Sequence, residues 1–398
     1  MKLPRFPVTP VIYLLLLLTI GFSNNLPGDE HKNTKSPTSA WIVRYLLLSK
    51  NDIDTAVRDL SDAGIKTVFL QVSGRCQSFF PSAILATAEE LDNRGDLADP
   101  FKYFINKAQQ RGISVHAWIN VLFAWSKPQK PAADEHPFNL HPEWFTHNKR
   151  GESYRAMTMG RLNRLSVSGY FLSPAEEGVV NLMGRYIEEI VTKYNVQGIH
   201  LDYIRYPTRG SGVGPEERSL FERRFYMDPL SFETDNGSLV ERYGEEGVRD
   251  LDLKWKNFRA GLVTDLVRSI RADLRRSGQD ILLSAAVFPD PDSARVIYGQ
   301  DWPTWIAEDL VDFVAIMNYS PNMSEFVRVL QKSKKKSDSS RIVVGVATYN
   351  QSITNTLKAA RFARDWGFDG VSFFSYNDIS TKRRSLEHIR RFIRESEQ

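Results

Sequence analysis

The feature that most constrains the fold is an alternation, from Trp41 onward, of short β-branched or aromatic runs with longer segments of helical periodicity. Such alternation predicts parallel strands joined by crossover helices. Eight runs have this character, and they span residues 41–47, 67–72, 114–119, 198–203, 281–287, 313–317, 343–347 and 370–374. Residues 342–347 are apolar or glycine throughout, which is typical of a strand buried on both faces.

Three predicted helices end directly before a glycine, as many helices do because glycine readily adopts the left-handed conformation that follows a C-terminus. The helices and their glycines are 52–63 with Gly64, 100–111 with Gly112, and 355–366 with Gly367. Eight strands, separated by helices that end at glycine, predict an α/β fold, a (β/α)8 TIM barrel. An open, doubly wound parallel sheet is the alternative.

Two connections are too long for simple crossovers. Residues 120–173 follow the third predicted strand and are rich in Trp, His, Pro and Asn, and residues 205–250 follow the fourth. Long ordered loops are usually functional, and barrel enzymes build their active sites at the carboxyl ends of the strands. We therefore expect the site at this end, beneath the long loops after strands 3 and 4.

The N-terminus has the pattern of a secretory signal. Lys2 and Arg5 precede an apolar run over residues 11–18, and small and polar residues follow it. We expect a signal peptide over residues 1–23 and an exported protein, either periplasmic, attached to the cell envelope or secreted. A retained anchor is the alternative, although the run is shorter than a bilayer requires, and this segment could contact the membrane transiently.

Residues 24–39 are rich in Asn, Pro, Lys, Ser and Thr, which predicts a flexible linker before a single barrel domain over residues 40–398. The composition, 42% hydrophobic and 25% charged, is that of a globular protein. The net charge of +4 is too mild to indicate a nucleic-acid partner. His116 and His200 lie on different strands without a third His or Cys nearby, so neither a metal nor another cofactor is expected.

Asp202, near the end of the fourth predicted strand, is the strongest catalytic candidate. His200 and Asp202 face the same side of the strand, and a charged side chain in an apolar strand must be satisfied or functional. One interpretation is a buried ion network with Arg205 or Arg44. The other is a catalytic carboxylate that acts as nucleophile or base on a sugar ring.

Glycoside hydrolysis ordinarily needs a second carboxylate. Asp290 follows the fifth predicted strand, and Asp301 precedes Trp302 in the next loop. Asp290 could instead belong to a turn beside proline, and Asp301 could be a helix N-cap ahead of Pro303. Both remain candidates for the acid.

Aromatic and polar side chains at the strand ends are expected to contact a sugar, because flat rings suit the C–H faces of pyranoses and polar groups bind hydroxyls. Each could also be structural. The predicted contacts are Arg75, Trp118, Asn120, His200, Arg205, Tyr206, Trp302, Asn318, Tyr319 and Tyr376.

The segment Gly198 to Pro207 resembles the strand-four signature of the bacterial glycosyl hydrolase-like 10 family. The resemblance extends over residues 40–395 and includes the third strand at 116–120, the loop at 141–144, and the segments 300–302 and 312–319. It implies a TIM-barrel hydrolase of bacterial envelope glycans, either peptidoglycan or exopolysaccharide.

Related barrels with a longer acidic fourth strand carry their acid Glu where this chain has Ile204, so chitinase chemistry of that type is not implied. The sequence therefore predicts an exported glycoside hydrolase that cleaves O-glycosidic bonds with two carboxylates. A barrel that binds a glycan without cleaving it, or serves as a scaffold, is the alternative.

Overall fold

The computed structural model describes residues 38–93 and 97–397. The predicted signal peptide, and all but the last two residues of the predicted linker, lie outside these ranges. The first barrel strand begins at Ser39. No helix within the described ranges is both long and apolar enough to cross a membrane.

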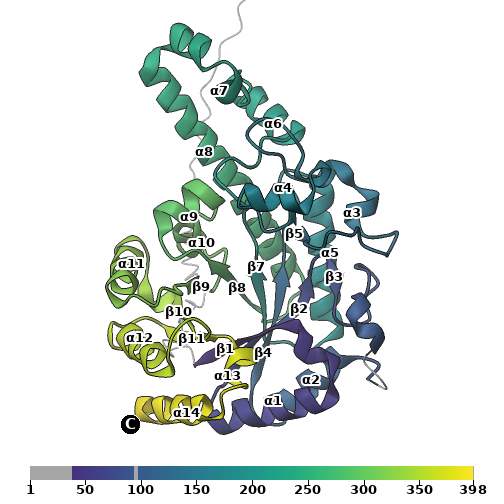
Figure 1. The fold of residues 1–398 in the computed structure, drawn as a ribbon, viewed down its shortest axis with the longest axis vertical. Helices are drawn as coiled ribbons and strands as arrows, with labels where there is room; N and C mark the ends of the chain where they lie inside the picture. Colours follow the sequence, from purple (N-terminus) through teal and green to yellow (C-terminus); the bar gives the residue numbers. More distant parts are fainter. Residues whose placement is uncertain (1–37, 94–96, 398) are drawn as a thin grey trace, which may run out of the picture. The chain divides into compact units, whose positions relative to one another are not determined.

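Eight parallel strands form a closed barrel in the described part of the chain (Figure 1). They are β1 (Ser39–Ile42), β2 (Thr67–Gly74), β4 (Ser114–Asn120), β7 (Gly198–Asp202), β8 (Leu282–Val287), β9 (Phe313–Met317), β10 (Ile342–Ala347) and β11 (Gly370–Phe374). They neighbour one another in chain order, and β1 pairs with both β2 and β11. The predicted (β/α)8 barrel is confirmed, and the open sheet is wrong because the closed sheet has no free edges.

The first strand is shorter than the sequence suggested. β1 ends at Ile42, and a 3-10 helix, η1 (Arg44–Leu48), follows it. Leu46 and Leu47 are buried by this turn and pack in the main core, so their apolar character reflects helical packing and not a longer strand. The early end of β1 leaves Arg44 at the carboxyl end of the barrel.

Helices cover the outside of the barrel, as crossover connections require. Those that lead into a barrel strand are α1 (Lys50–Ala63), α2 (Pro100–Gln109), α5 (Glu177–Lys193), α8 (Asn236–Arg276), α10 (Trp302–Ala307), α11 (Met323–Lys336) and α12 (Ile353–Asp365), and α14 (Arg383–Glu397) follows the last strand. In α1 the Ser49 side chain accepts a hydrogen bond from the backbone N–H of Asp52, and Gly64 ends the helix at φ 84°. These residue types are the ones that helix ends prefer.

A compact apolar core fills the inside of the barrel. Its buried members alternate along the strands with residues that face the helices. They are Trp41, Phe69, Trp118, Phe313, Ala315 and Val343. Gly345 leaves room for Trp41, because a Cβ at this position would lie 2.9 Å from the indole ring. The interior is therefore packed, and a substrate must bind at the end of the barrel.

The connection after β4 folds against the carboxyl end of the barrel. It contains an antiparallel pair, β5 (Phe123–Trp125) and β6 (Tyr170–Phe171), and the short helices α3 (Pro137–Leu140), η3 (Pro142–Trp144) and α4 (Met159–Arg164). The backbone N–H of Val121 donates to the carbonyl of Asp202, so this connection starts tied to the end of β7.

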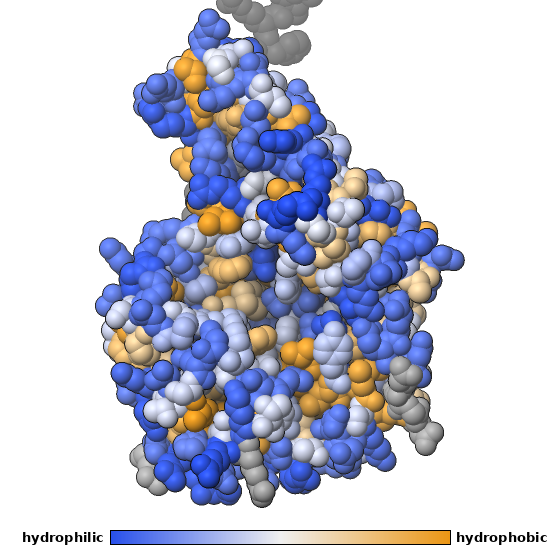
Figure 2. Space-filling model, in the orientation of Figure 1, coloured by the Kyte–Doolittle hydropathy of each residue, from blue (hydrophilic) through white to orange (hydrophobic). Residues whose placement is uncertain are grey.

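The connection after β7 forms a helical arm, which we define as residues 213–258. It contains α6 (Pro215–Phe225), α7 (Ser231–Thr234) and the first part of α8, which kinks at Gly244 (Figure 1). The arm has its own apolar core, formed by Val213, Phe221, Met227, Leu239 and Trp255. Hydrophilic residues cover most of its visible surface (Figure 2). The predicted long loop is thus largely helical.

Candidate active site

Asp202 ends β7 at the mouth of the barrel, and its carboxylate is held by two donors. The indole Nε1 of Trp118 donates to Oδ2 at 3.1 Å, and the backbone N–H of Tyr203 donates to Oδ1 at 2.7 Å. Asp202 pairs in register with Asn120 on β4, and its side chain is 7% exposed. The carboxylate is therefore fixed in position and largely buried.

The surroundings of Asp202 favour its protonated form. Burial raises the pKa of this carboxyl, and the Arg205 charge and the hydrogen bonds from Tyr203 and Trp118 offset that effect only in part. Such a carboxyl keeps its proton to a higher pH than a free aspartate. It can therefore donate a proton under conditions in which an exposed aspartate is fully ionised.

Two tyrosines flank Asp202. Burial raises the pKa of both Tyr203 and Tyr319, and the negative charge of Asp202 raises it further. Tyr203 adopts φ 50°, a left-handed conformation that turns the chain sharply at the end of the strand. The centre of its ring lies 4.6 Å from that of Phe123, in the connection after β4.

Arg205 supplies the positive charge nearest to Asp202. Its guanidinium carbon lies 4.6 Å from the centre of the Tyr203 ring and 5.0 Å from that of Phe288. Burial lowers the pKa of Arg205, and its Nε has no hydrogen-bond partner among the described residues. A cation held between aromatic faces with an unused donor can bind a substrate oxygen.

A chain of amide and guanidinium groups crosses the first three strand ends. Arg44 Nη1 donates to Gln71 Oε1 at 2.9 Å, and Gln71 Nε2 donates to Asn120 Oδ1 at 3.2 Å. Burial lowers the pKa of Arg44, and the positive charge of Arg75 also acts on it. This network orients Asn120 beside Asp202 and brings a second cation to the mouth.

Aromatic rings form a wall on the opposite side of the mouth. The ring centres of Tyr319 and Phe374 are 5.2 Å apart in a stacked arrangement, and Tyr349 lies 6.3 Å from Tyr319. Tyr349 is 53% exposed, so its ring faces solvent. A wall of exposed and half-buried rings next to a carboxylate suits the apolar faces of sugar rings.

The structure brings together five of the residues that the sequence suggested: Asp202, Trp118, Asn120, Arg205 and Tyr319. Sequence reasoning missed Gln71, Tyr203 and Tyr349 as site residues. Gln71 is a polar residue in an otherwise apolar strand, a signal that could have been used. Tyr203 gave no such signal, because its left-handed backbone is a property of the folded turn.

His200 lies inside the barrel and not at the mouth. Its Nε2 accepts a hydrogen bond from the Trp41 indole at 3.0 Å, its Nδ1 lies 2.9 Å from Ser284 Oγ, and its ring stacks on Phe69 with centres 4.1 Å apart. Burial lowers the pKa of His200 well below its usual value. Both ring nitrogens have partners, so His200 is a neutral core residue that does not reach a substrate.

Four further sequence candidates are buried in structural contacts. Trp302 donates to the Phe288 carbonyl at 3.1 Å, and the Tyr376 hydroxyl donates to Asp59 at 3.2 Å. The Tyr206 ring packs under the Arg259 guanidinium. Arg75 forms an ion pair with Glu90. None of these side chains is more than 5% exposed.

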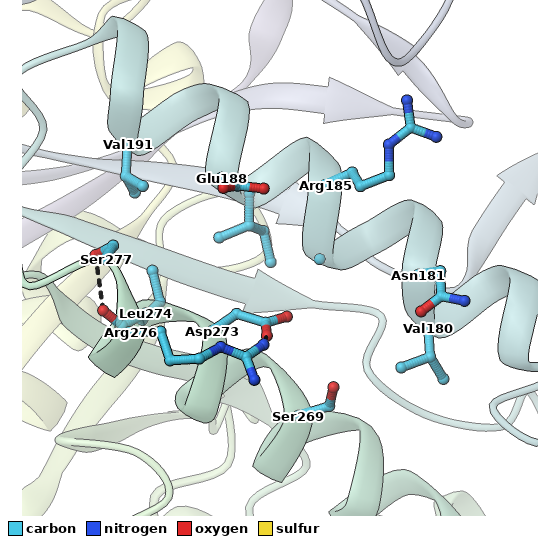
Figure 3. Close-up of a pocket in the computed structure, with 12 residues that line it drawn as sticks. Val180, Asn181, Arg185, Glu188, Val191, Ser269, Asp273, Leu274, Arg276 and Ser277 are labelled. Carbon is cyan, nitrogen blue, oxygen red and sulfur yellow. Dashed lines mark hydrogen bonds and ion pairs between the residues drawn. The ribbon is translucent and has the colours of Figure 1, made fainter.

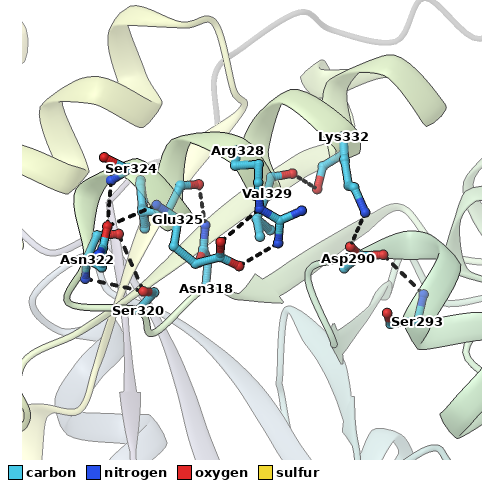
Figure 4. A network of polar contacts seen from close by, with 12 residues as sticks. Asp290, Ser293, Asn318, Ser320, Asn322, Ser324, Glu325, Arg328, Val329 and Lys332 are labelled. Carbon is cyan, nitrogen blue, oxygen red and sulfur yellow. Dashed lines mark hydrogen bonds and ion pairs between the residues drawn. The ribbon is translucent and has the colours of Figure 1, made fainter.

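Asp290 is the cap of α9 (Pro291–Tyr298) and does not contact Asp202. Its carboxylate accepts hydrogen bonds from the backbone N–H of Ser293 at 3.1 Å and from Lys332 Nζ at 2.6 Å (Figure 4). Burial alone would raise its pKa, but the Lys332 bond and the helix cap outweigh burial, and the pKa of Asp290 is lowered. Such a group stays ionised, which is the wrong state for a general acid.

Asn318 and Asp301 also have structural partners. Asn318 Nδ2 donates to the Phe326 carbonyl at 3.0 Å, which ties the end of β9 to α11 (Figure 4). Asp301 accepts from Arg295 Nε at 2.9 Å, and Arg295 in turn donates to Asn257 of α8. The described structure thus holds both candidate partner carboxylates in salt bridges, away from the contacts of Asp202.

One sizeable cavity is not part of the mouth. It has a volume of about 640 Å³ and lies between α5 and α8, where Gly184 faces Asp273 and Arg185 and Glu188 line one side (Figure 3). Its lining runs along α5 from Val180 to Val191 and includes the last turns of α8, on the outside of the barrel. Barrel enzymes do not place their chemistry there.

Within the described ranges, no group of three or more His, Cys, Asp or Glu side chains is arranged to hold a metal ion. The chemistry available at the mouth is therefore that of a carboxyl group, two arginines, amides and phenols. This set can transfer a proton and bind hydroxyl groups.

A model of the family described as "Glycosyl hydrolase-like 10" matches residues 37–367. Glycosyl hydrolase DigH of Escherichia coli (strain K12) is 22% identical over 371 residues, which cover 86% of this chain and 74% of DigH. Glycosyl hydrolase YngK of Bacillus subtilis (strain 168) is 21% identical over 348 residues, covering 79% of this chain and 59% of YngK.

Solved structures share the fold at low sequence identity. The PgaB (BpsB) glycoside hydrolase domain from Bordetella bronchiseptica superposes with a TM-score of 0.58 at 13% identity, over 90% of this chain and 98% of that domain. The catalytic domain of β-amylase from Paenibacillus polymyxa gives 0.51 at 12% identity, over 86% and 93%. At such identity the likeness establishes the barrel fold and nothing finer.

Proposed function

The chain belongs to the glycosyl hydrolase-like 10 family, and on that premise we propose that it is an exported glycoside hydrolase. Its substrate is an envelope or extracellular glycan, either peptidoglycan or an amino-sugar exopolysaccharide, and it cleaves O-glycosidic bonds. The observation that carries the proposal is Asp202, a fixed carboxyl group of raised pKa at the barrel mouth beside an aromatic wall.

Asp202 acts in this proposal as the proton donor to the glycosidic oxygen. Its raised pKa suits an acid better than the nucleophile that the sequence alone suggested. After the bond breaks, the Asp202 carboxylate accepts a proton from the attacking water and returns to its starting state. Arg205 and Asn120 bind hydroxyl groups of the sugar, and the rings of Tyr319 and Tyr349 contact the apolar face of the sugar ring.

This proposal departs from the two-carboxylate mechanism expected from the sequence: the attacking group comes from the substrate, and Asp202, not a residue at position 204, is the acid. Asp290 and Asp301 are engaged in ion pairs with Lys332 and Arg295, so neither is a suitable second carboxylate. In an amino-sugar glycan the 2-acetamido oxygen can attack the anomeric carbon, the glycosidic C–O bond breaks, and water then opens the ring so formed. This is why an amino sugar is the preferred substrate class, and it predicts retention of the anomeric configuration.

The names of the relatives support a glycoside hydrolase. DigH and YngK are named glycosyl hydrolases, and the PgaB domain is a glycoside hydrolase domain. The aromatic wall and the two arginines at the mouth are features that a polysaccharide site requires.

The test is the release of new reducing ends by the purified protein. Three substrates are compared: chitin oligosaccharides, peptidoglycan strands stripped of their peptides, and cello-oligosaccharides, which lack the acetamido group. We expect cleavage of at least one of the first two and none of the third, with the β-anomer formed first by NMR if the cleaved bond is β. Cleavage of the cello-oligosaccharides at a similar rate would contradict substrate assistance.

One observation favours a second function, that of a glycan-binding barrel without hydrolysis. Asp202 has no second carboxylate among its contacts in the described structure. If the amino-sugar glycans bind but none releases reducing ends, the binding function replaces the hydrolase.

Export is tested by cell fractionation and by mapping the N-terminus of the mature protein. We expect cleavage after the apolar run near residue 23 and recovery from the envelope or the medium. Full-length protein in the cytoplasm with an intact N-terminus would contradict export.

A further inference from the structure

A second binding feature lies where the helical arm meets the connection after β4. A pocket of about 500 Å³ opens there between α7, α8 and the segment that follows Asp202. Trp255 and Phe232 supply apolar surface, and Lys149, Arg209, Lys256 and Arg259 supply positive charge. Trp255 also belongs to the apolar core of the arm, so packing fixes the position of this side chain in the pocket.

The acids in this pocket do not balance its cations. Lys149 pairs with Glu233 at 2.7 Å, and Lys256 pairs with Asp252. Within the described ranges, Arg209 and Arg259 have no ion pair. Arg209 therefore faces this pocket without a carboxylate partner, whereas the charge of the buried Glu217 acts on Arg259.

Arg259 holds the loop that presents Arg209. It is 2% exposed, and its guanidinium donates to the carbonyls of Arg209 at 3.0 Å and Thr208 at 3.2 Å, while its Nε has no hydrogen-bond partner among the described residues. The guanidinium also lies over the Tyr206 ring, 4.5 Å from its centre. Burial lowers the pKa of Arg259 and so does the Arg209 charge, whereas the charges of Tyr206 and Glu217 raise it.

The carbonyl contacts of Arg259 have a simpler explanation, in which Arg259 only holds the loop at residues 208–209 in place. That explanation does not account for Arg209, whose exposed side chain has no ion pair among the described residues. A neighbouring pocket of about 330 Å³ shares Lys149 and Gly210 and adds Arg150, Arg161 and Glu152. Arg161 pairs with Glu152, so Arg150 is the further cation of that pocket without an ion pair in the described part of the chain.

The pocket is close enough to the mouth to serve the same polymer. Arg209 follows Asp202 by seven residues, so the two Cα atoms are at most about 25 Å apart even if the segment were fully extended. Arg205 lies between them in the sequence and points into the mouth. A glycan chain bound at Asp202 can therefore reach the arm.

We propose that this pocket binds an anionic substituent, a carboxylate or a phosphate, carried by the glycan whose backbone occupies the barrel mouth. The inference rests on the proposed function and names the substrate more narrowly, as an acidic glycan. Arg209 is the specificity-determining residue, because it is exposed and unpaired, and Arg259 holds the loop that presents it.

The experiment measures binding by calorimetry. It uses the whole chain with the substitution Asp202→Asn, which suppresses cleavage of the glycan during the measurement. The probes are peptide-stripped peptidoglycan strands and the same strands with their carboxylates converted to amides. We expect amidation to weaken binding about tenfold, as for loss of one charge-assisted contact, and Arg209→Gln to remove that difference. Arg249→Gln is the control, since Arg249 is an exposed arginine of the helical arm, on α8, and lies outside both pockets.

Two sources of the anion are distinguished by a third probe, a wall glycan that carries phosphodiester polymer. If Arg209→Gln weakens its binding more than that of the carboxylate strands, the substituent is a phosphate. Equal behaviour of Arg209→Gln and Arg249→Gln on every probe would overturn the proposal. Arg209-dependent binding without release of reducing ends by the unmutated protein would overturn the hydrolase and leave this site standing.

Discussion

The indole of Trp118 donates a hydrogen bond to Oδ2 of Asp202 across 3.1 Å, and so links the carboxyl ends of two adjacent barrel strands. This bond stabilises the charged form of the carboxyl, against the burial that favours the neutral form. The balance between the two effects sets the protonation state of Asp202. The predictions below follow from it and from the contacts around it.

Asp202→Asn should lower kcat by about 10²–10⁴-fold, because an amide cannot donate the proton that the leaving group requires. The fold should survive because asparagine has the same size, although its single oxygen can accept only one of the two hydrogen bonds from Trp118 and Tyr203. Reducing-end assays measure the first effect, and circular dichroism and thermal melting the second. Retention of full activity in a folded variant would remove Asp202 from the mechanism.

Asp290→Ala and Asp301→Ala should act on stability and not on catalysis. Asp290 caps α9 and pairs with Lys332, so its loss should cost about 1 kcal/mol of unfolding free energy. We expect kcat/KM of both variants to stay within about threefold of the parent. A loss as large as that of Asp202→Asn in either variant would identify the missing second carboxylate.

Trp118→Phe should shift the pH profile of kcat/KM. Activity that needs protonated Asp202 falls as pH rises through its pKa, which lies above the usual value near 3.9. Removing the indole donor takes away a contact that lowers this pKa, so the falling limb should move to higher pH. A limb that moves to lower pH, or does not move, would contradict the assignment of Asp202 as the acid.

The stability of the protein relative to Asp202→Asn should depend on pH in a defined direction. A carboxyl whose folded pKa is raised contributes stability below its unfolded pKa and loses that contribution as pH rises through the folded pKa. The parent should therefore lose stability relative to Asp202→Asn as pH rises above about 4, the unfolded pKa. Urea denaturation of both proteins at pH 4 and pH 7 measures the change, and a difference that is independent of pH would contradict it.

His200→Ala should destabilise the fold by about 2–5 kcal/mol, because it leaves a cavity inside the barrel and removes the partner of the buried Trp41 indole. His388→Ala is the matched control, since His388 is exposed on α14, and should cost less than about 0.5 kcal/mol. Equal melting temperatures of the two variants would show that His200 is not part of the interior network.

The sequence could predict most of the barrel and part of its site. Strand and helix identity follow from local patterns, which is why the eight strands and the glycine that ends α1 were found without a structure. The end of β1 was misjudged because apolar residues at 46 and 47 fit a strand and a buried turn equally well. Asp202, Trp118 and Asn120 were found because alternation and strand ends locate them.

What the sequence alone determined is the succession of eight strands and their helices, and the position of Asp202 at the end of the fourth strand. The pairing of β1 with β11, which closes the barrel, is a result of the tertiary structure. Only the tertiary structure decided which side chains share the mouth with Asp202: Tyr203 through its left-handed backbone, Gln71 and Arg44 through neighbouring strand ends, and not His200, Asp290 or Asp301, whose partners lie elsewhere. The physical reason is that strand patterns are local, whereas hydrogen bonds, burial and the pKa they produce depend on residues that are distant in the chain.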